Sequence, residues 1–268
     1  SKKKFKPGID FSADFLLKFG VGLMGLKFSY KNFISIGLSP IIFIFILILL
    51  IILSGILLSK IFRKETSFGL LSGGAVAICG ASAAVAIFSV FSRSSNLNNY
   101  HLSIVILGTT LLSTISMILY PLVFTFFITS NIELGFLLGT SIHDTVGVVG
   151  AGYTLNNDVG FYSTFFKMIR ISFLPVILTL IILFFKGSKK KKFFFPWFLI
   201  LFFSLAIFRN ILKIPDELIS SINLISIFLI LVSISSIGLK GNLFSIKGLG
   251  STYFLILFLE TLIILCLS

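Results

Sequence analysis

The sequence predicts an all-α polytopic membrane protein that crosses the bilayer several times. The mean hydropathy is +1.13, and 57% of the 268 residues are hydrophobic. Only 12% of the residues are charged, whereas a soluble domain typically carries about 25%. Apolar blocks of roughly 20 residues, the length that crosses the hydrocarbon core as a helix, recur along the whole chain. These blocks are continuous and do not alternate with period two, so membrane-spanning helices are expected in place of strands.

Nine hydrophobic segments are expected, each crossing the membrane once, within a single transmembrane domain over residues 1–268. They cover about 11–28, 38–58, 68–91, 102–128, 134–152, 161–185, 193–212, 218–239 and 249–267. Two distant stretches, 25–37 and 238–250, both begin with Gly-Leu-Lys and have a later glycine in common. Seven segments lie between them, and an odd number of crossings would invert one copy relative to the other, as in transporters with inverted repeats.

Basic residues between the segments predict the orientation in the membrane. Lys and Arg gather in cytoplasmic loops, so the N-terminus is expected in the cytoplasm and the C-terminus outside. The cytoplasmic side receives fourteen: Lys2, Lys3, Lys4, Lys6, Lys60, Arg63, Lys64, Lys186, Lys189, Lys190, Lys191, Lys192, Lys240 and Lys247. The outer side receives three: Lys31, Arg93 and Lys213.

The net charge of +13 is explained by these loops, so the lipid bilayer is the expected partner and nucleic acid is not. Lys18, Lys27 and Arg209 lie near segment ends, where long basic side chains can reach the headgroups. Lys167 and Arg170 lie deeper in their segment and share one helix face, because they are three residues apart. They could still reach the outer headgroups, or they could turn inward beside the segment at 134–152, which is the orientation that we predict.

The sequence offers little support for an enzyme or for a metal site. Cys79 and Cys266 lie far apart in apolar segments, without a CxxC pair or a His/Cys cluster, so no disulfide, zinc or other cofactor is expected. Ser141, His143 and Asp144 are the residue types of a hydrolytic triad. However, neighbouring residues on one helix point about 100° apart, and a triad needs the histidine between the other two groups. No catalytic residue is therefore assigned.

Two segments contain unusual runs of small residues. Residues 69–88 read GLLSGGAVAICGASAAVAIF, and residues 139–152 read GTSIHDTVGVVGAG. Small residues allow close helix packing, but they also suit a helix that is broken within the membrane. A break exposes backbone N–H groups at the positive end of the new helix dipole, where an anion can bind. Two discontinuous helices are therefore expected.

These stretches resemble the YeiH-type family of bacterial integral membrane proteins, a family named for an assigned sulfate-export activity. The resemblance rests on ICGASAA (78–84), GTSIHDTVGVVGAG (139–152), KMIRISFLP (167–175) and FPWFLILF (195–202), which occur in the same order. It implies a multispanning transporter of the bacterial inner membrane, built from inverted repeats and crossing broken helices. Family members usually have a further N-terminal hairpin, so we expect a shortened or incomplete chain. They also more often have Glu at the position of Asp144.

The combined expectation is a secondary transporter that exports sulfate, a sulfonate or a similar small oxyanion, coupled to protons. His143 would carry the coupling proton, since histidine titrates near neutral pH, and Asp144 would orient it. The substrate would be bound by backbone N–H groups, hydroxyls and basic side chains. These expected substrate-binding residues are Gly80, Ala81, Ser82, Thr140, Ser141, Lys167 and Arg170.

Two alternatives stay open from the sequence. One is a cation or proton antiporter in which Asp144 binds the ion, and an additional intramembrane carboxyl group, such as that of Glu260, would favour it. The other is a membrane enzyme or scaffold that transports nothing. The direction of transport, the role of Glu260 and a homo-oligomeric assembly are also open.

Overall fold

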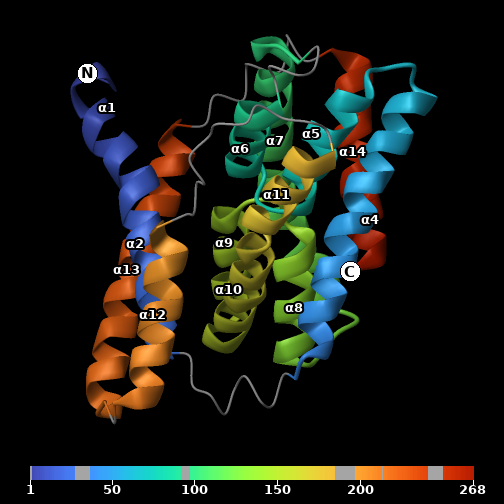
Figure 1. Cartoon of the computed structure of the whole chain (residues 1–268). Helices are drawn as coiled ribbons and strands as arrows, with labels where there is room; N and C mark the ends of the chain where they lie inside the picture. Colours follow the sequence, from blue (N-terminus) through green and yellow to red (C-terminus); the bar gives the residue numbers. More distant parts are fainter. Residues whose placement is uncertain (1, 28–36, 92–96, 185–196, 213, 241–249) are drawn as a thin grey trace. The chain divides into compact units, whose positions relative to one another are not determined.

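The computed structural model describes residues 2–27, 37–91, 97–184, 197–212, 214–240 and 250–268. All regular secondary structure in these ranges is helical, which confirms the all-α class for the described residues (Figure 1). Four stretches within them are long and apolar enough to cross a membrane, namely Ser39–Ile61, Asn99–Phe124, Asn157–Ile181 and Asp216–Ser233.

One compact unit joins residues 1–40 to residues 195–245. The helical run at its start begins earlier than the predicted residue 11, because the polar residues before the apolar block continue the helix. A side chain on Gly25 would collide with the backbone of Phe202, so this run and α12 pack at very short range. The elements are α1 (Lys2–Phe11), the π-helix η1 (Ser12–Leu16), α2 (Leu17–Leu23), the 3₁₀ helix η2 (Met24–Lys27), α12 (Trp197–Ile211) and α13 (Asp216–Lys240).

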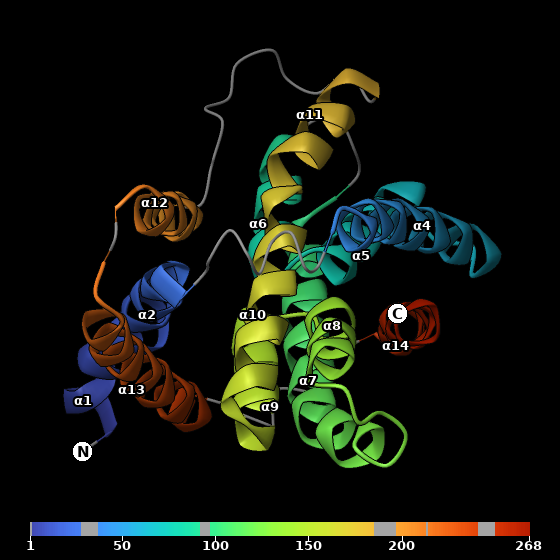
Figure 2. The ribbon, with the colours of Figure 1, turned by 90° about the horizontal axis from the view of Figure 1, so that it is seen from below.

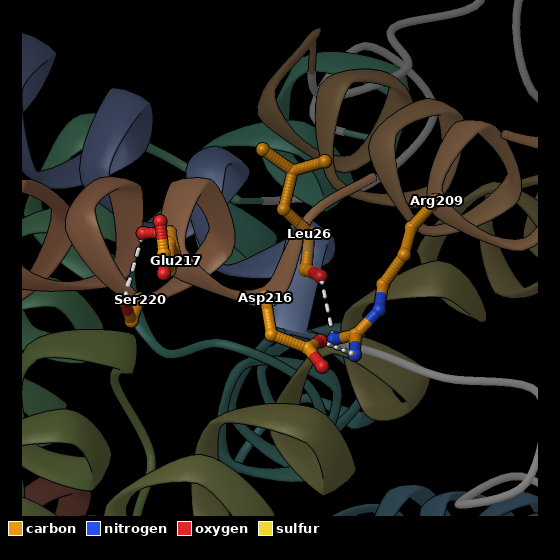
Figure 3. A network of polar contacts seen from close by, with 5 residues as sticks. All are labelled: Leu26, Arg209, Asp216, Glu217 and Ser220. Atoms are coloured by element: carbon orange, nitrogen blue, oxygen red, sulfur yellow. Dashed lines mark hydrogen bonds and ion pairs between the residues drawn. The ribbon is translucent and has the colours of Figure 1, made fainter. Parts of the chain in front are cut away.

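Arg209 ties the end of α12 to η2 in this unit (Figure 3). Its Nη1 donates to the Leu26 carbonyl oxygen over 2.9 Å, and its Nη2 lies 3.8 Å from Asp216 Oδ1. Asp216 is almost fully exposed, so the ion pair adds little stability. The bond to Leu26 matters more, because it satisfies a carbonyl at a helix end. Arg209 therefore binds the backbone of its own unit, which corrects the expectation that it only reaches toward headgroups.

The second compact unit joins residues 41–194 to residues 246–268. It contains the two segments rich in small residues, each of which forms a pair of short helices in place of one long helix. The elements are α4 (Ser39–Ile61), α5 (Thr66–Ala77), α6 (Ala81–Phe91), α7 (Asn99–Phe124), α8 (Asn131–Ser141), α9 (Thr145–Leu155), α10 (Asn157–Ser172), α11 (Leu174–Phe184) and α14 (Ser251–Leu267).

Helices α5 and α6 form a hairpin that reverses at residues 78–80, the α5–α6 hairpin. Near the start of α5, the Phe68 ring packs 5.8 Å from the His101 ring, which lies near the start of α7. Gly80, at the reversal, lies beside Thr109, eight residues further along α7. Helix α5 therefore runs alongside α7, and α6 returns toward the end at which α5 began (Figure 1).

Helices α8 and α9 form a second hairpin, the α8–α9 hairpin, which reverses at residues 142–144. Its two outer ends are tied together, because Asn156 Nδ2 donates to Asn131 Oδ1 over 3.2 Å. Helix α10 packs along both arms, as the view from below shows (Figure 2). The apolar side chains between the arms form a core cluster with Tyr120, near the end of α7. This hairpin therefore enters from the end of α7 opposite to the one at which the α5–α6 hairpin begins.

The prediction of two discontinuous helices is confirmed, but the prediction that segments 68–91 and 134–152 each cross the membrane once is wrong. Each arm has only 11 or 12 helical residues. At 1.5 Å per residue an arm is about 16–18 Å long, little more than half of the roughly 30 Å hydrocarbon core. Each segment therefore enters and leaves on one side. Removing two membrane crossings leaves the two termini on opposite sides, as before. The cytoplasmic N-terminus and the external C-terminus therefore stay predictions.

A further interruption follows Lys167 and Arg170. Helix α10 ends at Ser172 and α11 begins at Leu174, one residue before Pro175. Proline removes a backbone donor and clashes with the preceding turn, so Pro175 is the sequence signal for this break. The repeat of 25–37 in 238–250 and the basic run at 186–192 lie largely or wholly outside the described residues.

Candidate functional site

The tips of the two hairpins meet beside α7. A Cβ atom built on Gly80 would lie 3.5 Å from Thr109 Oγ1 and 3.8 Å from the Cβ of His143. Gly80 has φ +59°, a left-handed conformation that glycine adopts without steric cost. The first reversal therefore needs no side chain at its tip, and the backbone of one tip can approach the other closely. The predicted meeting of the two breaks is confirmed.

Two basic side chains from α10 hold the ends of both first arms. Lys167 Nζ donates to the carbonyl oxygens of Ile78 (3.0 Å), Ile142 (2.8 Å) and His143 (2.5 Å). The last carbonyl oxygens of a helix have no partner within the helix and carry the negative end of its dipole. A cation at this place satisfies both needs, and it bridges one hairpin to the other.

Arg170 makes the same kind of bridge with more bonds. Its guanidinium donates to carbonyl oxygens at the end of α5 and at the end of α8. The acceptors are Val76, Ala77 (2.5 Å), Gly139 (3.5 Å), Thr140 (2.7 Å) and Ile142 (2.9 Å). A planar fork with five N–H groups suits several carbonyls at once better than an ammonium group does. Arg170 therefore donates more hydrogen bonds between the two tips than Lys167 does.

The inward direction of these side chains follows from close helix packing. Lys167 and Arg170 are both fully buried. A Cβ atom on Gly139 would lie 2.7 Å from the Ser163 carbonyl oxygen and 2.9 Å from the Phe166 Cβ, so α8 and α10 can touch only with glycine there. This short distance brings the α10 side chains to the tips, as expected from their depth in the segment. Neither one forms an ion pair with a carboxylate among the described residues.

Asp144 caps the second arm of the α8–α9 hairpin. Its carboxylate accepts a hydrogen bond from the Gly147 N–H over 2.5 Å, and its own N–H donates to Ser113 Oγ over 3.2 Å. An aspartate at this position satisfies a free N–H group of the first turn and complements the positive end of the dipole. The expected hydrogen bond between Asp144 and His143 is not formed, because Nε2 of His143 meets Thr261 and its Nδ1 has no partner among the described residues.

Thr261 of α14 orients His143 instead. His143 is fully buried, and its Nε2 lies 2.9 Å from Thr261 Oγ1. The Thr261 hydroxyl donates to the Leu257 carbonyl over 2.7 Å, so its oxygen accepts from His143. We assign the Nε2–H tautomer to the neutral ring on this basis. Nδ1 then carries a lone pair, and it has no hydrogen-bond partner among the described residues. His143 can accept a proton at this atom.

The N-terminus of α6 differs from that of α9. Gly80 precedes Ala81 and has no side chain to act as a cap, and the first turn contains no acidic residue. The Gly80 N–H donates to the Ala75 carbonyl oxygen over 2.8 Å, so this N–H is not free for a ligand. The Cys79 thiol contacts the Ala83 N–H and the Ser82 side chain. Of the backbone N–H groups expected to bind substrate, those of Ala81 and Ser82 remain candidates.

The hydroxyl groups expected to bind substrate are used within helix α8. Thr140 Oγ1 donates to the Phe136 carbonyl oxygen over 2.7 Å, and Ser141 Oγ donates to the Leu137 carbonyl oxygen over 2.6 Å. Both side chains are buried at the α8–α9 tip, whereas Ser82 is exposed. The structure thus brings Thr140, Ser141 and the basic pair to one place. The two hydroxyl hydrogens there already have acceptors.

Sequence comparison identifies the family. A profile of the family described as "Conserved hypothetical protein 698" matches residues 1–257. The UPF0324 membrane protein CT0845 of Chlorobaculum tepidum is 34% identical over 249 residues, which cover 91% of this chain and 69% of the relative. The UPF0324 membrane protein TauZ of Paracoccus denitrificans is 32% identical over 262 residues, covering 95% and 77%. The chain belongs to this family. It is the YeiH-type family.

Other YeiH-type relatives are also described as membrane proteins, such as the UPF0324 membrane protein RA0957 of Rhizobium meliloti, which is 33% identical over 87% of this chain and 68% of its own length. No solved structure matches the chain. Membrane location is therefore supported both by the relatives and by the four long apolar helices.

Several residues of the candidate site were not found from the sequence. Thr109 and Ser113 come from α7, and Thr261 from α14. Thr109 and Ser113 lie in a long apolar helix, where single hydroxyl residues commonly bond to their own backbone. The sequence has no signal that separates them from other such residues. Thr261 had one indirect signal, because it follows Glu260, an acidic residue in the middle of an apolar segment.

Proposed function

We propose that this YeiH-type protein is a secondary transporter of a small oxyanion such as sulfate or a sulfonate. One observation carries the proposal: of the four helix ends that meet at the hairpin tips, three are complemented by charged side chains and one is not. Lys167 and Arg170 complement the negative ends of α5 and α8. Asp144 complements the positive end of α9. The first turn of α6 contains no acidic residue, and an anionic ligand would supply the missing charge.

The charge balance at the tips supports the same proposal. Two basic side chains and one carboxylate gather there, all contributed by segments in the interior of the unit. A surplus of positive charge in a medium of low dielectric constant attracts an anion more strongly than it would in water. In this proposal Ala81 and Ser82 offer their N–H groups. Lys167 and Arg170 hold the tips in place and raise the local potential.

His143 is proposed to carry the coupling proton. Its Nδ1 is buried and has no hydrogen-bond partner in the described part of the chain, while Nε2 is held by Thr261. A proton that binds at Nδ1 adds positive charge beside the α6 tip, so oxyanion binding and proton binding would favour each other. This linkage is the simplest form of proton–anion coupling that the geometry supports.

The alternatives from the sequence gain less from the structure. An antiporter that binds a cation at Asp144 would have to remove this carboxylate from the α9 cap and bring a second positive charge beside Lys167. For an enzyme or a scaffold, the described residues contain no group of three metal-binding side chains, and no observation favours these two functions.

Sulfate flux in proteoliposomes tests the proposal. We expect the full chain to move radiolabelled sulfate or a small sulfonate, faster with a pH gradient than without one. His143→Gln should stay in the membrane and respond less steeply to the gradient than the wild type. His101→Gln is the matched control, since His101 pairs with Tyr253 away from the tips, and it should keep the response. Absence of flux for all these anions would exclude oxyanion transport, and a normal gradient response in His143→Gln would make His143 structural.

A further inference from the structure

Glu260 is a buried carboxyl group that the proposed transport mechanism does not use. It lies on α14, is fully buried, and faces α4 and α5. A Cβ atom on Gly55 would lie 2.5 Å from Glu260 Oε1, so a side chain at residue 55 would displace the carboxyl group from its present place. On the other side, Ser72 Oγ of α5 donates to Glu260 Oε1 over 2.7 Å.

The surroundings of Glu260 fit the protonated carboxylic acid. Oε1 has one neutral partner, Ser72, and Oε2 has none among the described residues. An ionised carboxylate buried without a cation costs several kcal/mol, roughly the range known for intramembrane acids. Among the described residues, no hydrogen bond or ion pair connects Glu260 to a cation. Helix α5 has no titratable residue, and those on the other helices packed around α14 are Lys60, Tyr100, His101, Tyr120 and Glu133, with Tyr253 and Cys266 on α14 itself.

Most of those titratable groups lie at the outer ends of their helices. Lys60 and Glu133 are exposed at the end of α4 and the start of α8. His101 and Tyr100 lie at the start of α7 and pack around Tyr253. Tyr253 is seven residues before Glu260, roughly 10 Å along the axis. His143 is the titratable group that approaches α14 at the level of Glu260, through Thr261.

Consecutive residues of α14 therefore contact both hairpins. Glu260 binds Ser72 in the first arm of the α5–α6 hairpin, and Thr261 binds His143 at the tip of the α8–α9 hairpin. The Ser72 bond suits a neutral acid in a dry interface. If α5 moves away from α14, water reaches the carboxyl group, which then ionises at neutral pH as exposed glutamates do.

We propose that Glu260 is a second proton-binding site, which holds a proton while α5 packs against α14 and releases it when the two helices separate. This inference rests on the proposed transport function, because the proton is released within a transport cycle. It assigns Glu260, in place of Asp144, as the acid that works with His143. Asp144 keeps its role as the α9 cap.

Labelling of the wild-type chain tests the site without any transport. Dicyclohexylcarbodiimide reacts with protonated carboxyl groups in apolar surroundings, and mass spectrometry of the peptides locates the adduct. We expect Glu260 to be labelled in the purified full chain in lipid vesicles, with labelling lost as the pH rises. Labelling that does not change with pH would overturn the proposal. Protection by sodium ions at constant pH would also overturn it, because Glu260 would then be a sodium ligand.

Transport variants test the coupling. Glu260→Gln mimics the protonated acid and should still move sulfate, but it should lose one proton per transported sulfate. Glu133→Gln is the control, since this exposed acid lies at the start of α8, and it should keep the wild-type ratio. An unchanged ratio in Glu260→Gln would overturn the proposal. If the wild type moves no sulfate, the proposed function fails, while the pH-dependent labelling still decides whether Glu260 binds a proton.

Discussion

The α5–α6 and α8–α9 hairpins follow similar paths, but they turn with different residues. Both bring a chain to the middle of the unit and return it, and both first arms end at the carbonyl oxygens that Lys167 and Arg170 bind. The α5–α6 hairpin turns at Gly80 with a positive φ. The α8–α9 hairpin turns through extended residues, with ψ 138° at Ile142 and ψ 161° at Asp144.

The extended turn places two polar side chains at the tip, whereas the glycine turn has Ile78 and Cys79 beside a residue without a side chain. His143 and Asp144 therefore occupy the second tip, where one binds α14 and the other caps α9. At the first tip, Gly80 has no side chain, and the first turn of α6 contains no acidic residue. The α8–α9 hairpin thus carries an acidic cap of its own, whereas the start of α6 is where the proposed anion would bind.

The largest expected effect concerns the sides from which the two hairpins enter. In a chain without Cys79 and Cys266, we introduce single cysteines at exposed positions, Thr66→Cys and Asn99→Cys for the first hairpin and Glu133→Cys and Asn157→Cys for the second. An impermeant thiol reagent added outside intact cells should label the second pair and leave the first pair unlabelled. The reason is that the two ends of one hairpin lie on one side of the membrane, and the two ends of the other hairpin lie on the opposite side.

Different labelling within either pair would contradict the hairpin and restore a single crossing. Labelling of the first pair from outside would keep the hairpins but reverse the predicted orientation. With the hairpins, the connection that contains Arg93 is assigned to the cytoplasmic side. The basic residues then divide as fifteen to two, which favours this orientation more strongly than fourteen to three.

The next largest effect is expected on stability, when Arg170 no longer connects the two hairpin tips. Arg170→Met should lower the free energy of unfolding by about 3 kcal/mol or more, because each buried carbonyl left without a donor costs about 1–3 kcal/mol. Lys167→Met should cost less, since Lys167 binds fewer carbonyls than Arg170. Thermal unfolding of the purified chain in detergent measures both variants.

Arg209→Met is the matched control for this series. Arg209 also donates to a backbone carbonyl, that of Leu26, but it is partly exposed and lies in the other compact unit. We expect a loss of about 1 kcal/mol, the usual net value of a hydrogen bond. Equal losses in Arg170→Met and Arg209→Met would show that the two hairpin tips do not depend on Arg170.

A third prediction makes the α6 end resemble the α9 end. Ser82→Asp places a carboxylate in the first turn of α6, at an exposed position where it should be tolerated. Two charges about 4 Å apart repel by roughly 4 kcal/mol at an effective dielectric constant of about 20, so apparent sulfate affinity should fall at least about tenfold. Ser82→Asn is the isosteric control and should stay near the wild-type value. Equal affinities in the two variants would place the anion elsewhere.

Much of the fold follows from the sequence because membrane burial leaves strong signals. Apolar blocks marked the helices, and the glycines around Cys79 and His143 marked the two breaks. Hydropathy does not show whether a broken segment continues or returns, because both arms are equally apolar. The decisive contacts, such as those of Phe68 with His101 and Asn131 with Asn156, join residues far apart in the chain.

The sequence predicted which residues gather at the site better than it predicted which groups they bind. The depth of Lys167 and Arg170 indicated that they turn inward, but their carbonyl acceptors depend on where the arms of both hairpins end. The neighbours His143 and Asp144 suggested a hydrogen-bonded pair. In the extended turn their side chains instead reach different helices, so the partner of His143 is Thr261.

The smallest expected effect separates the two tasks of Asp144, its cap and its charge. Asp144→Asn keeps an oxygen that can accept from the Gly147 N–H, and asparagine caps helices about as well as aspartate. Stability should therefore change by only a few tenths of a kcal/mol, whereas Asp144→Ala should lose about 1 kcal/mol.

Sulfate affinity should rise modestly in both variants, because each removes the negative charge at the tips. Their pH profiles of transport should match the wild type closely, since His143 is held by Thr261. A large shift of that profile in Asp144→Asn alone would show that the carboxylate acts on His143 during transport. Weaker sulfate binding in both variants would instead make Asp144 part of a cation site.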